Sequence, residues 1–130
     1  MGGYCMSELC GKLTEACQRL GFKIKETGDE TIVICYQMHV IHICFNEKTP
    51  EDCQVIGVVA KDVPEDDRLQ VLEHCNSLNE RLKHFKYYIM GPGVVASIEF
   101  RFHNNKELIS QLKFAVHSIS LAKNLFERNN

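Results

Sequence analysis

The segment TIVICYQMHVIHICF, residues 31–45, decides how this chain is expected to fold. Its first six and last seven residues are rich in β-branched and aromatic side chains, which favours two strands. Only Gln37 and Met38 lie between them, so the two strands would form a two-residue hairpin and pair antiparallel. Because such turns usually contain Gly or Asn, a single long bent strand remains an alternative.

The rest of the chain alternates between helical and strand patterns. The expected helices cover residues 7–20, 63–83 and 105–126, and the expected strands cover residues 22–26, 31–36, 39–45, 53–61, 85–90 and 94–102. This gives the order α-β-β-β-β-α-β-β-α, with Gly91-Pro92-Gly93 marking a second hairpin. Strands joined mainly by hairpins predict a twisted antiparallel sheet with helices packed on it. The fold class is therefore α+β, in a single domain over residues 1–130.

The composition excludes several classes of function. Hydrophobic residues make up 45% and charged residues 25% of the 130 residues, which is typical of a globular domain. The net charge of −2 lacks the positive excess that general nucleic-acid binding needs, so no nucleic-acid partner is expected. There is no run of about 18 apolar residues, and the N-terminus lacks a secretory pattern. We expect a cytoplasmic protein that does not enter the membrane.

Seven cysteines and six histidines raise the question of a metal or redox site. The odd cysteine count and the absence of C-x-x-C favour free thiols that serve as small apolar side chains. His42 and Cys44 are two residues apart and share one face of a strand, whereas His39 lies on the other face. A metal would need further ligands, such as Cys35 or Cys53 from neighbouring strands. A structural role is favoured, and neither a metal nor another cofactor is expected.

No sequence motif indicates catalysis. The chain lacks G-x-S-x-G, H-E-x-x-H, G-x-G-x-x-G and the Walker loop of nucleoside triphosphatases. Glu65, Asp66 and Asp67 lie in the first turn of a predicted helix, where carboxylates interact favourably with the helix dipole. We therefore expect no enzymatic activity and no catalytic residues.

Several strands carry apolar residues on both faces. Ile32 and Ile34 alternate with Val33 and Cys35, although an antiparallel sheet usually leaves one face to water. This excess suggests that another subunit covers the second face.

The second predicted helix carries an apolar stripe that could face a partner. We expect the partner or dimer interface to use Val71, Leu72, Cys75 and Leu78. The alternative is that the same stripe belongs to the core of the chain itself.

The segment CNSLNERLKHFKYYIMGPGVVASIEFRF, residues 75–102, resembles the YbjN family of bacterial sensory transduction regulators. The resemblance rests on Asn76 and Asn79 near the end of a helix, and on Lys86 at the start of the following strand. It implies the fold of type III secretion chaperones, in which two copies commonly pair, and it implies no catalytic residue or cofactor. The glycine-proline turn and the many cysteines depart from the family pattern.

The two asparagines have a physical interpretation as well. Asn76 and Asn79 are three residues apart and share a helix face. Their amides could cap backbone groups of the adjoining hairpin, or they could lie on solvated surface.

The sequence thus predicts a non-enzymatic protein-binding or regulatory module that acts as a homodimer. The alternative is a metal- or thiol-based sensor that uses His42, Cys44 and a further cysteine.

Overall fold

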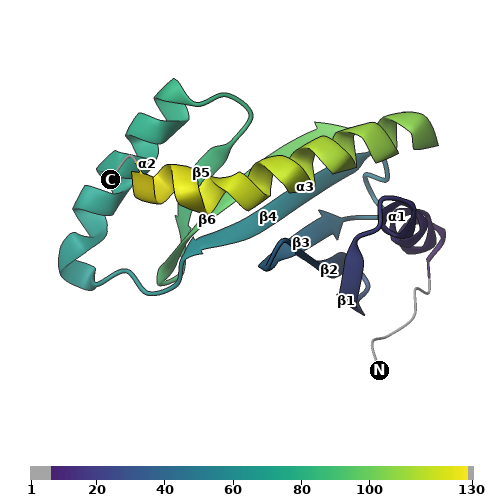
Figure 1. Ribbon diagram of the computed structural model, residues 1–130, viewed down its shortest axis with the longest axis horizontal. Coiled ribbons are helices and arrows are strands. Elements are labelled where there is room, and N and C mark those ends of the chain that lie inside the picture. Colours follow the sequence, from purple (N-terminus) through teal and green to yellow (C-terminus); the bar gives the residue numbers. More distant parts are fainter. Residues whose placement is uncertain (1–6, 129–130) are drawn as a thin grey trace.

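The computed structural model describes residues 7–128, and the predicted element order is confirmed (Figure 1). A one-turn 3-10 helix, Glu65–Asp67, precedes the second α-helix. The elements are α1 (Glu8–Arg19), β1 (Lys23–Thr27), β2 (Thr31–Tyr36), β3 (His39–Phe45), β4 (Asp52–Ala60), α2 (Arg68–Arg81), β5 (Lys86–Met90), β6 (Gly93–Arg101) and α3 (Asn105–Arg128).

The six strands of the described chain form one antiparallel sheet in the order β1-β2-β3-β4-β6-β5. Each strand from β1 to β4 pairs with the next, and the β5–β6 hairpin joins the sheet through β6, which pairs with β4 along almost its whole length. The fold is therefore α+β in class, and its sheet is antiparallel throughout, as the hairpin signals predicted.

The β2–β3 hairpin forms despite its unfavourable turn residues. Gln37 and Met38 both have positive φ values, 49° and 69°, which is the left-handed pattern of a two-residue hairpin turn. Such a conformation costs a residue other than Gly about 1–2 kcal/mol. Six consecutive residue pairs, from Thr31 with Cys44 to Tyr36 with His39, hold the two strands together and offset that cost. The alternative of one bent strand is wrong.

The three α-helices pack against one face of the sheet, and α3 lies across β4 and β6 (Figure 1). The Tyr87 hydroxyl of β5 donates a hydrogen bond to the Ala122 carbonyl of α3 at 2.8 Å. His74 of α2 makes a 2.9 Å hydrogen bond with the Phe126 carbonyl, so α2 is tied to the end of α3. The fully buried core between helices and sheet includes Leu13, Ile32, Ile34, Ile41, Ile43, Val55, Leu112 and Val116.

Most of the described cysteines are free thiols inside or beside this core. Cys17, Cys53 and Cys75 are buried, and burial raises the pKa of the Cys17 thiol to about 12. Burial raises the pKa of the Cys53 thiol as well. These thiols stay protonated at neutral pH and act as small apolar side chains. The expectation of free thiols is wrong at Cys10, which is disulfide-bonded.

Candidate functional site

The face of the sheet that carries no helix combines apolar side chains with polar and charged ones. Residues that pair across neighbouring strands share a face, so the register defines this surface: Val33 lies opposite His42, His42 opposite Ile56, and Val58 opposite Val95. We call this surface the open face. Its apolar side chains and cysteines are Val33, Cys35, Val40, Cys44, Ile56, Val58, Tyr88, Met90 and Val95, and its uncharged polar side chains are Thr31, His42, Gln54 and Ser97.

The open face combines a tightly packed centre with exposed apolar side chains. Val33 and Val95 are buried beneath their neighbours, whereas Val40, Val58 and Met90 expose 44%, 48% and 50% of their surface. The helices of the described chain lie on the other face of the sheet (Figure 1). Exposed apolar side chains that share one face of a sheet are typical of interaction surfaces.

Two ion pairs lie on the same face, toward the other end of β4, β5 and β6 from Val58 and Met90. The Lys86 ammonium is 2.9 Å from a Glu99 carboxylate oxygen, and Arg101 Nε is 3.0 Å from Asp52 Oδ1. The register puts all four on the open face, since Asp52 pairs with Arg101 and Lys86 pairs with Ser97, two residues from Glu99. The face therefore has exposed apolar side chains toward one end of its strands and two charge-balanced ion pairs toward the other end.

The metal candidates of the sequence lie on the open face but do not form a ligand set. His42 and Cys44 are half-buried neighbours on β3, and Cys35 lies on the same face. Cys53 pairs with Phe45 and points to the helix side, so it cannot supply a third ligand. Across residues 7–128, no group of three or more His, Cys, Asp or Glu side chains could hold a metal ion. Burial raises the pKa of the Cys44 thiol, against a smaller lowering effect of Thr31.

The predicted interface stripe on α2 is divided between core and surface. Leu78 is fully buried and Cys75 is 3% exposed, so both belong to the core of the chain. Val71 is half-buried, and Leu72 is 45% exposed. Leu69, one turn earlier, is 69% exposed and was absent from the predicted stripe. The apolar side chains that α2 leaves exposed are therefore Leu69 and Leu72, whereas Val71 packs against the core.

The capping interpretation of the two asparagines is confirmed at one of them. Asn79 Nδ2 donates to the Tyr87 carbonyl at 2.9 Å, and the Tyr87 N–H donates to Asn79 Oδ1 at 2.7 Å. The side-chain amide therefore pairs with the outer edge of β5 as a neighbouring strand would. Asn76 is exposed, as the alternative of solvated surface predicted.

The antiparallel sheet with helices on one face defines an α+β scaffold whose fold is like that of type III secretion chaperones. The comparisons with known proteins identify the family within this class. Residues 10–107 match the family model of YbjN, described as "Putative bacterial sensory transduction regulator". The chain belongs to the YbjN family.

Solved structures share the fold at low sequence identity. YbjN from E. coli aligns with a TM-score of 0.67 and 11% identity, over 85% of each chain. An uncharacterised protein from Methanothermobacter thermautotrophicus aligns with a TM-score of 0.62 and 13% identity, over 92% of this chain and 97% of that one. The Yersinia pestis type III secretion chaperone SycH, solved with a fragment of YscM2, aligns with a TM-score of 0.51 and 13% identity, over 86% of this chain and 97% of SycH.

None of the curated proteins matches this sequence. Family and fold together fit a non-enzymatic binding or regulatory role. Within residues 7–128, no helix is long and apolar enough to cross a membrane.

Proposed function

We propose that this protein is a non-enzymatic protein-binding or regulatory module that acts as a homodimer in the cytoplasm. The open face carries the proposal, because its exposed valines and Met90 are left without a covering helix in the described chain. Removing such side chains from water is favourable, so a partner that covers them gains binding free energy.

A protein fits the open face better than a small molecule does. Small molecules usually bind in concave sites that bury most of their surface. Protein interfaces combine apolar and charged side chains, and the open face carries exposed valines as well as the Lys86–Glu99 and Asp52–Arg101 pairs. The chaperone SycH was solved in complex with a protein fragment, which supports a protein as the class of ligand.

Pairing of two copies would use α2. Leu69 and Leu72 are three residues apart and therefore share one side of the helix. Cys75 and Leu78 fix the helix to the core from below, so the leucines are presented by a firmly packed element. Two exposed leucines from each copy would form the centre of the pair.

The molar mass in solution tests this pairing, by size-exclusion chromatography with light scattering under a reductant. The wild type is expected to have twice the 14.9 kDa mass of one chain. Leu72→Glu should reduce the mass to that of one chain, because pairing would bury an unpaired carboxylate. Met90→Glu, which places the same charge on the open face, should keep the mass of the pair.

Two outcomes would contradict the proposal. A wild-type protein with the mass of one chain at concentrations of about 100 µM would exclude stable pairing. The dissociation constant would then exceed about 100 µM, so the binding free energy of the pair would be weaker than about 5.5 kcal/mol. Loss of the pair in Met90→Glu and its retention in Leu72→Glu would show that the open face, rather than α2, is the pairing surface.

A further inference from the structure

Strands β3 and β4 separate toward the tip of the β2–β3 hairpin. Their pairing runs from Phe45 with Cys53 to Ile41 with Gly57 and stops there. His39 and Val40 continue β3, and residues 58–60 continue β4, with no pairing between them. The register of β4 with β6 shifts between Val58 and Ala60, so β4 bends at this point while it remains paired with β6.

The separation leaves a hollow of about 490 Å³, which we call the β3–β4 split. Residues 38–42 form one wall and residues 57–61 form the other, while Ile119 and Lys123 of α3 close the helix side. This volume is within the range of about 300–1,000 Å³ that is usual for ligand sites. The split connects the helix side of the sheet with the open face.

Both outer edges of the sheet have features that hinder the addition of a further strand, and the split has none of these features. At one edge, β1 has the sequence KIKET and a register irregularity between Ile24 and Glu26, and both charge and irregularity discourage strand addition. At the other edge, the Asn79 side chain is hydrogen-bonded to the N–H and the carbonyl of Tyr87, so these groups are not available to an added strand. In the split, residues 39–40 of β3 and 58–60 of β4 are not paired with each other, and the walls beside them are largely apolar.

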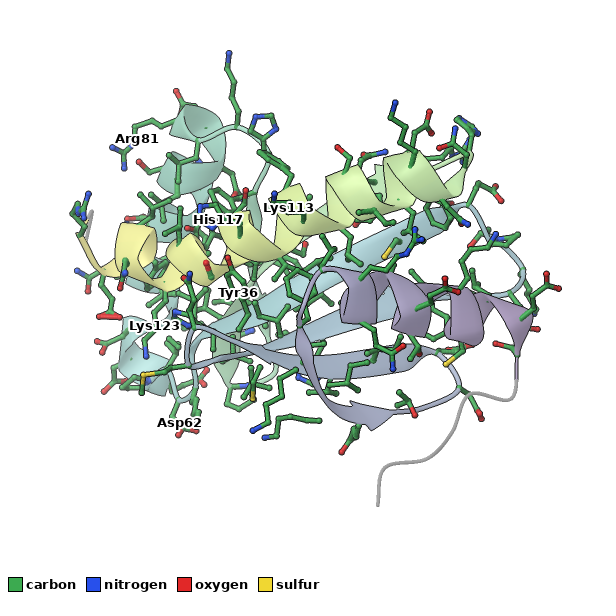
Figure 2. The ribbon with its side chains drawn as sticks, turned by 45° about the vertical axis from the view of Figure 1, so that its right-hand side comes forward. Tyr36, Asp62, Arg81, Lys113, His117 and Lys123 are labelled. Carbon is green, nitrogen blue, oxygen red and sulfur yellow. The ribbon has the colours of Figure 1, made fainter. Side chains whose placement is uncertain are left out.

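The charges around the split favour one kind of occupant. Its lining includes Lys61 and Lys123, together with His39 and His42, and no acidic side chain. Asp62 follows Lys61 in the chain but does not line the split, and Figure 2 shows it apart from Lys123. An occupant with carboxylates would complement these lysines.

We propose that the β3–β4 split binds an extended acidic peptide segment of a protein partner, by strand addition along residues 58–60 of β4. In an added strand, successive side chains point to opposite faces. Acidic side chains would point to the helix side, toward Lys123, and apolar side chains would join Val40 and Val58 on the open face. The inference rests on the proposed function, since it names the chemistry of the protein that the scaffold binds.

The test uses a fluorescein-labelled peptide amide, Gly-Val-Glu-Val-Glu-Val, and its counterpart with Lys in place of Glu. Fluorescence anisotropy should show at least tenfold tighter binding of the acidic peptide to the wild type. The double variant Lys61→Glu, Lys123→Glu should lose at least tenfold affinity for it. The control Lys106→Glu, Lys113→Glu changes the net charge equally at two exposed lysines of α3 outside the split, and it should keep the affinity within threefold.

A further peptide tests strand addition itself. Methylation of the backbone nitrogen of the central Val removes a hydrogen-bond donor without changing any charge, and it should weaken binding at least tenfold. Amide resonances of residues 39–40 and 58–60 should shift when the unmethylated peptide is added.

Equal binding of the acidic and basic peptides, or equal loss in the two double variants, would overturn the proposal. Shifts confined to Tyr88 and Met90 would also overturn it, but they would leave binding at the open face intact. Failure of the pairing part of the proposed function would appear separately, as a single-chain mass of the wild type.

Discussion

Asn79→Ala tests how the helix α2 is joined to the sheet. The substitution removes both hydrogen bonds between the Asn79 amide and the Tyr87 backbone, at 2.9 Å and 2.7 Å. The matched control is Asn76→Ala, which makes the same change one turn earlier on an exposed part of the same helix.

The expected magnitude follows from these two bonds. A hydrogen bond contributes about 1 kcal/mol net to the free energy of unfolding, so the loss of two costs about 2 kcal/mol. Alanine favours a helix over asparagine by roughly 0.5 kcal/mol, and both variants gain this amount. Asn79→Ala should therefore be about 1.5 kcal/mol less stable than the wild type, whereas Asn76→Ala should be about 0.5 kcal/mol more stable.

Urea unfolding followed by circular dichroism measures both values. If the free energy of unfolding falls by about 2 kcal/mol per molar urea, the urea midpoints of the two variants should differ by about 1 M. Asn79→Asp keeps the acceptor for the Tyr87 N–H but loses the donor to the carbonyl, so its stability should also be below that of the wild type. Equal midpoints for Asn79→Ala and Asn76→Ala would refute a stabilising role for the amide.

The strained turn, the close helix contact and a buried thiol each allow a further prediction. The double substitution Gln37→Asn, Met38→Gly should raise the free energy of unfolding by about 1–2 kcal/mol, because Asn and Gly adopt a positive φ more readily than Gln and Met. An unchanged urea midpoint would contradict this. Gly57→Ala should cost about 1–3 kcal/mol, since its Cβ would lie 2.6 Å from a methyl group of α3, whereas Gly11→Ala, with no atom within 4 Å, should stabilise α1 by about 0.5–1 kcal/mol. Because burial raises the pKa of Cys17 from 9.0 to about 12, the unfolded state loses this proton first, so stability should fall as the pH rises above 9. Cys17→Ala should make urea midpoints less dependent on pH between 8 and 10.5, and an identical dependence would contradict this cause.

Much of the fold was predictable because its local signals agree with its packing. Ser7 caps α1 by accepting a hydrogen bond from the Cys10 N–H at 3.0 Å, and Gly21 adopts a φ of 76° after the helix ends. The Asn104 side chain caps α3 by accepting a hydrogen bond from the Glu107 N–H at 2.8 Å. These interactions depend on residues a few positions apart, which a sequence displays directly.

The candidate site was only partly predictable, because it depends on strand register and on helix placement. The sequence shows that Val33 and Cys35 are apolar, but only the pairing shows that they share a face with Val58. Helical periodicity could not separate the buried Leu78 from the exposed Leu72, since both fit an apolar stripe. The β3–β4 split has no local signal, because it arises where the pairing of two strands stops.

Photo-crosslinking at the open face tests the central claim, that this face binds a protein, most directly. A benzoylphenylalanine placed at Met90 in living cells should yield a discrete adduct whose mass exceeds that of two chains. Tyr88→Glu, on the same face, should abolish this adduct, and the same crosslinker at Lys113 on α3 should not form it. An adduct of equal yield from Lys113, or none from Met90, would contradict protein binding at the open face.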